Sequence, residues 1–462
     1  MLILRQFLRS VAPNESMGTN MVRIKPFRGY YYNLAKIRDF AQVITPPYDV
    51  ISPESEKLYY ERSPYNFARV DLPKASGSHN PYENAANLLQ SWMKEKVLVQ
   101  DPEPALYVYS HTYANDNNST EITRFGFVSL LDLAPGNDVF AHEQTLQKPF
   151  EDRLHLMEAT RVYFGLIFLL YDDQERVIDR LLESHIRDHA PLIHFKDNDG
   201  VLHKLWSFSN TDHIKRITRE MEKYSCVIAD GHHRFKVARQ YYKECVEHNQ
   251  DPESARWPMV CFVNSYHEGF AIRPTNRVLF NLPVPPDLVK RLQEKFDVTE
   301  EKDIITALRK VRTTSIMVDE TQNIKNIVIA MFDNTKQKAY FLRLWNPTAL
   351  KSGHSDIYTK IDVNVLHTLI FQDILGISSE DEEKGTKLTY VKGDEATLDL
   401  LRLYPKKYIL GFFINPPLKR EIFMTARNGE KMPQKSTYFY PKLFSGIILH
   451  KLPELPAKKR RR

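Results

Sequence analysis

The sequence predicts an α+β protein, in which an N-terminal half is followed by a mixed α/β C-terminal half. Two observations predict this fold class. Strand-like and helix-like patterns interleave along the whole chain and are not confined to one region. The 462 residues, 42% hydrophobic and 26% charged, have the composition of a folded protein and are enough to bury a large core.

Helical patterns come first and strand patterns follow. Ser52 or Pro53 opens a short helix, because serine caps helices well and proline fits the first turn. Apolar residues then recur at helical spacing over 82–96. Two strands are predicted over 105–113 and 122–131, on either side of a turn-rich Asn/Asp stretch.

The middle of the chain alternates buried strands with helices. Residues 162–171 are apolar at nearly every position, which predicts one fully buried strand. The stretch SCVIADGHHRFKVARQYYKE predicts a buried strand over 226–229, a turn at 230–231 and an amphipathic helix over 232–244. The other elements expected here are helices over 175–186 and 212–222 and a strand over 258–264.

A proline-rich connection at 283–286 separates the two predicted halves. We expect residues 21–281 to form the N-terminal half and 282–453 the C-terminal half. Residues 1–20 are expected to be a disordered extension, and 454–462 a solvated basic tail that ends in KKRRR.

Composition excludes several classes of protein. The formal net charge is +6, but the basic tail carries much of it, so the body is nearly neutral and DNA binding is not expected. The chain has three cysteines, Cys226, Cys245 and Cys261, without CxxC spacing, which indicates a reducing compartment. No apolar run approaches the ~20 residues that span a bilayer. We therefore expect a cytoplasmic protein without a membrane segment.

The strand–turn–helix junction at Asp230-Gly231-His232-His233-Arg234 is the sharpest candidate site. A helix that begins directly after a glycine turn exposes backbone N–H groups and the positive end of its dipole, which suits phosphate. Arg234 could hold phosphate oxygens, His232 or His233 could donate hydrogen bonds or handle a proton, and Asp230 could bind Mg²⁺. The simpler interpretation, an Asp230 N-cap beside surface histidines, is about equally compatible with the spacing.

A second candidate group follows the strand at 122–131. His142 or Glu143 could act as a general base towards a hydroxyl, and Lys148 or Arg153 could neutralise phosphate charge. A polar loop in which Arg153 pairs locally with Asp152 is the simpler alternative. The histidines show no standard zinc-ligand spacing.

A third group lies near the C-terminus, in MPQKSTYFYPK. Lys435 and Lys442, with the Ser436 and Thr437 hydroxyls, suit phosphate, and an aromatic ring could stack on a base. An edge strand that packs its aromatic side chains is the alternative. Near the N-terminus, the rigid turn TPPYDVIS presents Asp49, either as an Mg²⁺ ligand or simply as part of a turn before the helix.

Seven ordered segments resemble those of a long prokaryotic family of unassigned function, often labelled Spo0J/ParB-like. They are PFRGYYYN, TPPYDVIS, NFARVDLP, HEQT with the following Lys148 and Asp152-Arg153, ADGHHR, RPTNR and MPQKSTYFYPKLFSG. The resemblance runs from about Met21 to Leu452. One departure is Asn276, which stands where the family pattern has histidine.

The resemblance implies a ParB/sulfiredoxin-like core. Members of that superfamily place a Gly-x-x-Arg turn against nucleotide phosphates, and Gly231 and Arg234 match it. The cysteine of sulfiredoxin is replaced by His232, and no basic helix-turn-helix is evident, whereas the related ADP-dependent free serine kinase carries a similar Asp-Gly-His turn. The resemblance therefore implies a kinase using ADP or ATP, with Mg²⁺, on free serine or a similar small alcohol. The alternatives are a nucleotide-binding regulatory module, for which a homodimer is expected, and an interaction protein with a decayed site.

Overall fold

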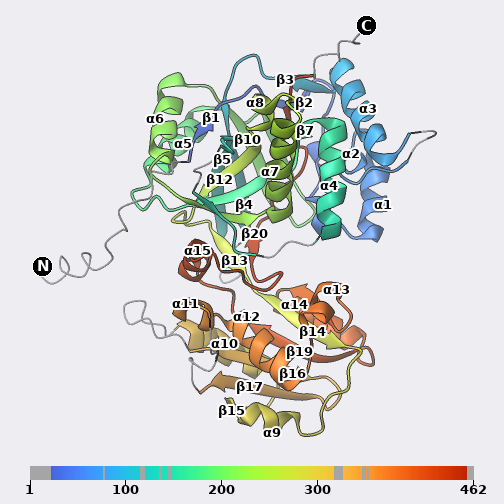
Figure 1. Cartoon of the computed structure of the whole chain (residues 1–462), viewed down its shortest axis with the longest axis vertical. Helices are drawn as coiled ribbons and strands as arrows, with labels where there is room; N and C mark the ends of the chain where they lie inside the picture. The colour runs from blue at the N-terminus through green and yellow to red at the C-terminus, as the bar shows by residue number, and fades with distance from the viewer. Residues whose placement is uncertain are drawn as a thin grey trace, which may run out of the picture.

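The computed structural model describes residues 22–75, 77, 79–114, 120–134, 138–143, 147–316, 326–345, 350 and 353–454. Residues 1–20 and the tail beyond Glu454 lie outside the described residues. The chain builds helices and sheets in both halves, which confirms the mixed α/β prediction. One large sheet with flanking helices forms the upper body in Figure 1, and a smaller sheet with its own helices forms the lower body.

The larger sheet has nine strands within the described residues and carries the hydrophobic core of the first half. Its order is β6-β11-β8-β12-β5-β4-β10-β9, and β1 pairs with β5. Most neighbours are antiparallel, but β11 runs parallel to β6 and β12 parallel to β8. Its strands are β1 (Ile24–Lys25), β4 (Leu106–Ala114), β5 (Glu121–Leu131), β6 (Val139–Phe140), β8 (Ile167–Tyr171), β9 (Ile193–Lys196), β10 (Leu202–Phe208), β11 (Cys226–Asp230) and β12 (Met259–Asn264).

Helices flank this sheet, and α4 and α7 pack side by side (Figure 1). Helix α3 begins with a capping box, in which Asn80 and Glu83 satisfy each other's backbone N–H groups. The helices are α1 (Pro53–Arg62), α2 (Ala68–Asp71), α3 (Pro81–Lys94), α4 (Gln147–Thr160), α5 (Val177–Asp188), α6 (Thr211–Met221), α7 (His232–Glu247) and α8 (Pro252–Ala255), with short 3-10 helices η2 (Phe40–Gln42) and η3 (Tyr48–Val50).

The smaller sheet has the order β15-β17-β16-β19-β14-β18. Its strands are β14 (Thr275–Phe280), β15 (Phe296–Glu301), β16 (Val328–Asp333), β17 (Lys338–Leu344), β18 (Leu388–Lys392) and β19 (Tyr408–Ile414). The associated helices are α9 (Leu288–Gln293), α10 (Ile304–Ile316), α11 (Asp356–Thr359), α12 (Asp362–Val365), the π-helix η5 (Leu366–Ile374), α13 (Ser379–Lys384), α14 (Asp394–Leu403) and α15 (Lys419–Arg427).

The C-terminal segment returns to the first body. Strand β20 (Tyr438–Tyr440) pairs with β13 (Ala271–Arg273) between the two bodies, and β21 (His450–Lys451) pairs with β7 (Val162–Tyr163). A further small pair joins β2 (Tyr30–Tyr32) to β3 (Leu98–Gln100). Residues 275–280 thus belong to the smaller sheet, while the segment after residue 440 packs into the core of the larger one. The domain division at residue 281 stays a prediction.

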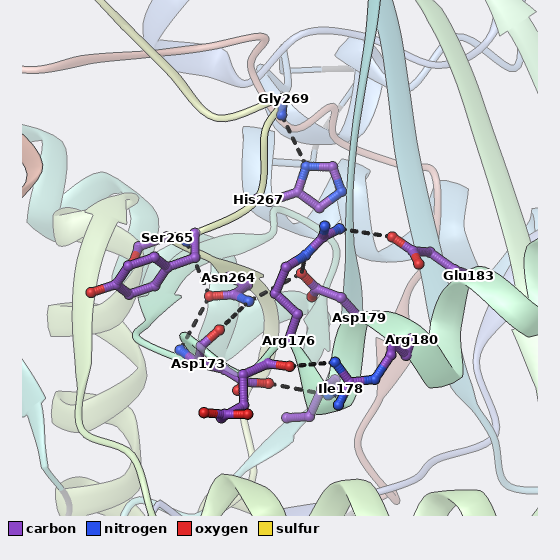
Figure 2. Close-up of polar contacts among 12 residues, drawn as sticks. Asp173, Arg176, Ile178, Asp179, Arg180, Glu183, Asn264, Ser265, His267 and Gly269 are labelled. Carbon is purple, nitrogen blue, oxygen red and sulfur yellow. Dashed lines mark hydrogen bonds and ion pairs between the residues drawn. The ribbon is translucent and has the colours of Figure 1, made fainter.

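Figure 2 shows how the chain is fixed where it leaves β12 for the second body. The Asn264 amide donates to Asp173 O at 2.8 Å and to the Asp179 carboxylate at 3.0 Å, and its oxygen accepts from the backbone N–H of Asp173. Arg176 Nε also donates to the Asp179 carboxylate, at 3.2 Å. Since Asn264 is fully buried, this network anchors the crossing point to helix α5.

One predicted element is wrong in detail. The apolar stretch 162–171 forms two strands, β7 and β8, and not one. The chain changes partners between them: β7 pairs with the returning C-terminal segment, and β8 pairs with β11 and β12. An apolar run indicates burial but not which strand pairs with it. In the described part of the chain, we find no helix with the length and apolar character to cross a bilayer.

Candidate functional site

A cavity of about 340 Å³ lies where the two bodies meet. We call it the main cavity. The first body contributes η3 and the β11–α7 junction, the second contributes β14 and β18, and the segment before and after β20 closes it. Its lining residues are Tyr48, Asp49, Val50, Glu143, Ala229, Asp230, Gly231, His232, His233, Arg234, Thr275, Thr389, Tyr390, Lys392, Gln434, Lys435, Thr437, Tyr438 and Lys442.

Gly231 turns the chain from β11 into α7 at the edge of the main cavity. Its φ of +86° lies in the left-handed region, which suits glycine, and an added Cβ would stand 3.1 Å from Arg234 Nε. Helix α7 runs for 16 residues from this point, and the cap uses no side-chain hydrogen bond. The main cavity therefore meets a helix N-terminus whose N–H groups and dipole favour an anion.

Asp230 is held between two cations. Its carboxylate accepts from Arg234 Nη2 at 2.8 Å and from Lys442 Nζ on the opposite wall. Burial alone would raise the pKa of Asp230, but Lys442 and Arg234 outweigh it and hold this pKa well below its usual range. Arg234 also donates through Nη1 to the carbonyl of Leu166. Asp230 is thus an ionised clamp between α7 and the C-terminal segment, and not the N-cap of the simpler interpretation.

Glu143 faces the same cavity in an environment that suits proton transfer. Burial raises the pKa of its carboxyl group, and Lys435 and Lys442 only partly offset this. Oε1 accepts from the backbone N–H of Ser436 at 3.2 Å, and Oε2 lies 3.7 Å from His232 Nδ1. A carboxyl group whose pKa is moved towards neutral is the usual form of a general base or acid.

The two neighbouring histidines are buried and neutral. His142 and His232 have exposed fractions of 0% and 7%, and their ring centroids lie 4.8 Å apart. Burial lowers the pKa of His142 to about 3 and that of His232 well below its ordinary value. His142 contacts Thr437 Oγ1 at 3.1 Å behind the cavity wall. The surface interpretation of His232 is therefore wrong, and Glu143 is the better placed base of the predicted pair.

Lysines from both bodies supply the positive charge. Lys392, on β18, places Nζ 4.6 Å from the centre of the Tyr438 ring, and Lys442 lies 5.3 Å from the same ring. Burial, followed by repulsion from Lys442, lowers the pKa of Lys392 to about 8. Lys392 and Lys435 are both exposed residues, whereas Lys442 is half-buried.

Other predicted site residues lie away from the main cavity. Arg153 is buried, binds Asp71 at 2.9 Å and stacks over the Tyr48 ring at 4.3 Å. Ser436 donates its hydroxyl to Pro433 O, so it shapes the loop. Lys148 belongs to α4, but its side chain lies outside the described residues. Asn276 is buried on β14, where it donates to Gly393 O and to Asp394 and does not line the cavity.

Several lining residues were missed by sequence reasoning. Tyr48 and Thr275 belong to the quoted segments TPPYDVIS and RPTNR, so those segments carried a signal. Thr389, Tyr390 and Lys392 lie on β18, where no motif marks them, and pairing of β18 with β14 brings them to the site. Gln434 and Tyr438 lie inside the recognised C-terminal segment, beside the residues that were chosen.

The residues do not form a metal site of their own. No group of three or more His, Cys, Asp or Glu side chains suited to a metal occurs among the residues that the structure describes. Of the two predicted Mg²⁺ ligands, both of which line the main cavity, Asp230 already accepts from Arg234 and Lys442. The predicted Mg²⁺ stays a prediction, and phosphate charge is better matched by the lysines.

Fold and site define the class of this protein: a mixed α/β protein with a cavity between two bodies that is lined by lysines, an arginine and the N-terminus of α7. The chain belongs to the family described as protein of unknown function DUF1015, whose model matches residues 24–364. No curated protein matches the chain.

Solved structures show distant likenesses. A mutant free serine kinase in complex with ADP is 12% identical, with a TM-score of 0.32, over 65% of this chain and 84% of that one. A conserved hypothetical protein from Pyrococcus furiosus is 12% identical, with a TM-score of 0.30, over 69% and 89%. SbnI from Staphylococcus aureus, truncated at its C-terminus, is 11% identical, with a TM-score of 0.31, over 69% and 85%.

Proposed function

We propose that this protein is a phosphotransferase that moves a phosphate from ADP or ATP to the hydroxyl group of a small acceptor. One observation carries the proposal. The cations Lys392, Lys435, Lys442 and Arg234, the N-terminus of α7 and the raised-pKa carboxyl of Glu143 all meet at one cavity. Phosphoryl transfer depends mainly on positioning and charge neutralisation, and these groups supply both.

The nucleotide phosphates bind at the start of α7. The backbone N–H groups after Gly231 donate hydrogen bonds to the phosphate oxygens, and Lys435 and Lys392 approach from the opposite wall. Arg234 and Lys442 are already paired with Asp230. They therefore orient the junction and contribute positive electrostatic potential more than direct hydrogen bonds to the phosphates.

The acceptor oxygen attacks the terminal phosphorus, and the bond from that phosphorus to the bridging oxygen breaks. The nucleotide leaves with the bridging oxygen, and Glu143 takes the proton of the attacking hydroxyl. The lysines offset the charge that develops on the leaving oxygen.

Free L-serine is the first acceptor to test. The Asp230-Gly231-His232 turn resembles that of the free serine kinase in sequence, and the ParB/sulfiredoxin-like assignment of the first half belongs to the same proposal. A cavity of about 340 Å³ is in the size range of small-molecule sites.

The test is a transfer assay with labelled nucleotide. Purified protein is incubated with γ-labelled ATP or β-labelled ADP and with L-serine, L-threonine or small alcohols, with and without Mg²⁺. We expect a labelled phospho-product that is lost when Lys435 is replaced by Ala. Nucleotide binding without a product from any acceptor would contradict the proposal and favour a nucleotide-binding regulatory module.

Nucleotide affinity is expected to fall as pH rises through about 8, the value to which the pKa of Lys392 is lowered. Below that pH the ammonium is charged and attracts phosphate; above it the side chain becomes neutral. Lys435, Lys442, Asp49 and Asp230 are the charged groups facing Lys392. The measurement is the nucleotide Kd from pH 6.5 to 9.5. An Lys392→Arg variant, which stays charged, should lose this pH dependence, and a fall that persists in it would contradict the assignment.

A further inference from the structure

A second cavity, of about 130 Å³, adjoins the main cavity on the side of the smaller sheet. Tyr390 and Gln434 line both cavities. The remaining wall is polar and comes from the π-helix η5, from α13 and from Lys431. Turns of π-helix often occur at functional sites, because they re-aim side chains that a regular helix would turn away.

Glu382, on α13, has an oxygen that lacks a donor. Oε2 contacts His367 Nδ1 at 2.9 Å, whereas Oε1 is buried and has no hydrogen-bond partner among the described residues. His367 Nε2 accepts from Arg277 Nε at 3.1 Å, so the ring proton is on Nδ1 and is donated to Glu382. A buried carboxylate oxygen without a donor is costly, and a bound cationic donor would satisfy it.

Lys431 supplies the opposite charge in the same cavity. Its Nζ donates to Ala141 O, and since an ammonium has three N–H donors, two are left for another acceptor. Thr368, Ser379 and Gln372 add hydroxyl and amide groups to the wall. A small polar cavity with one carboxylate and one ammonium matches a molecule that carries both charges itself.

We propose that this second cavity binds a zwitterionic α-amino acid, with its ammonium group at Glu382 and its carboxylate at Lys431. Tyr390 and Gln434 line both cavities, and in this proposal the side chain of the bound amino acid extends past them towards the main cavity. The further claim that this amino acid is the phosphate acceptor rests on the proposed function. The claim that the second cavity binds an amino acid does not.

A hydrogen-bonded chain links the two cavities. Arg277 is fully buried, and its Nη2 donates to Gln434 O and Lys435 O, both at 3.3 Å. The chain therefore runs from Glu382 through His367 and Arg277 to the backbone that carries Lys435. Arg277 belongs to RPTNR, a quoted segment to which sequence reasoning assigned no site residue; it is a positioning residue for both cavities.

The test is binding of L-serine to the nucleotide-free, full-length protein, measured by calorimetry. We expect Glu382→Gln to weaken binding at least ~10-fold, because a charged hydrogen-bond partner is lost. N-acetyl-L-serine, which lacks the ammonium, should bind as weakly to the unaltered protein. Glu380→Gln is the matched control, because it removes the same charge from an exposed position on the same helix.

The outcomes separate the two proposals. L-serine binding that is absent from the unaltered protein, or equal in Glu382→Gln, overturns the amino-acid site. Binding that depends on Glu382, without phosphotransfer to any acceptor, overturns the proposed function alone. Transfer to serine with an unchanged KM in Glu382→Gln overturns only the amino-acid site. Should Glu382→Gln fail to fold, Lys431→Met is tested with L-serine and with its methyl ester. Weaker binding of L-serine to this variant, and of the methyl ester to the unaltered protein, supports the amino-acid site, and unchanged binding overturns it.

Discussion

Replacing Glu143 by Gln is expected to lower the rate of phosphotransfer by about 10²–10⁴-fold, the usual contribution of a positioned general base. Glutamine keeps an oxygen that accepts from the Ser436 N–H, so the loop that carries Lys435 stays in place. It also removes a negative charge from a cavity that binds phosphate. Nucleotide affinity should therefore be unchanged or slightly higher, and the loss should fall on kcat.

Steady-state kinetics and nucleotide binding on the same preparation check this expectation, with Glu380→Gln as the control. In the unaltered protein, kcat should fall as pH is lowered, because protonated Glu143 cannot accept the hydroxyl proton. Burial raises the pKa of Glu143, so this loss should occur above the usual range of a glutamate. A Glu143→Gln variant with kcat within a few-fold of normal would remove Glu143 from the chemistry.

The sequence was most informative where local chemistry decides the structure. A buried strand, a glycine and an amphipathic helix at 226–244 predicted the β11–α7 junction, because glycine, helix periodicity and burial are all local properties. The positive φ of Gly231 follows from the same reasoning. Asp49, Glu143 and Lys435 were chosen because each lies within a segment quoted for the family resemblance.

What the sequence could not show is pairing at long range. Lys392 reaches the main cavity only because β18 pairs with β14 of the smaller sheet, and nothing near Lys392 indicates that register. Arg153 does pair locally with Asp152, as the simpler alternative expected, but its second partner was hidden, because Asp71 is 82 residues away. The split of 162–171 into β7 and β8 depends on a segment almost 300 residues later. Such contacts depend on tertiary packing, which local propensity does not encode.

Arg234 shows how burial changes the meaning of a predicted site residue. A phosphate ligand of the kind that the sequence predicts at Arg234 could be replaced by Ala with loss of nucleotide affinity and no effect on folding. The structure places the guanidinium of Arg234, only 12% exposed, against Asp230 and the Leu166 carbonyl just before the start of β8. Removing one partner of a nearly buried ion pair leaves an uncompensated charge and a carbonyl without its donor. We therefore expect Arg234→Ala to lower stability as well as nucleotide affinity.

Arg234→Ala is expected to lower the free energy of unfolding by about 3 kcal/mol, at the lower end for a broken buried pair because Lys442 still holds Asp230. Urea unfolding measures this, and Arg239→Ala, an exposed change on the same helix, should stay within about 0.5 kcal/mol of the unaltered protein. A loss below about 1 kcal/mol for Arg234→Ala would contradict the clamp.

Lys435 then separates binding from stability. It is exposed, so Lys435→Ala should leave the unfolding curve nearly unchanged while weakening nucleotide binding about 10- to 100-fold, the value of one charged hydrogen bond to phosphate. If Lys435→Ala binds nucleotide normally and Arg234→Ala loses both binding and stability, the arginine is needed to form the site and the phosphates lie elsewhere along α7. If Lys435→Ala alone loses affinity at full stability, the main cavity holds the phosphates.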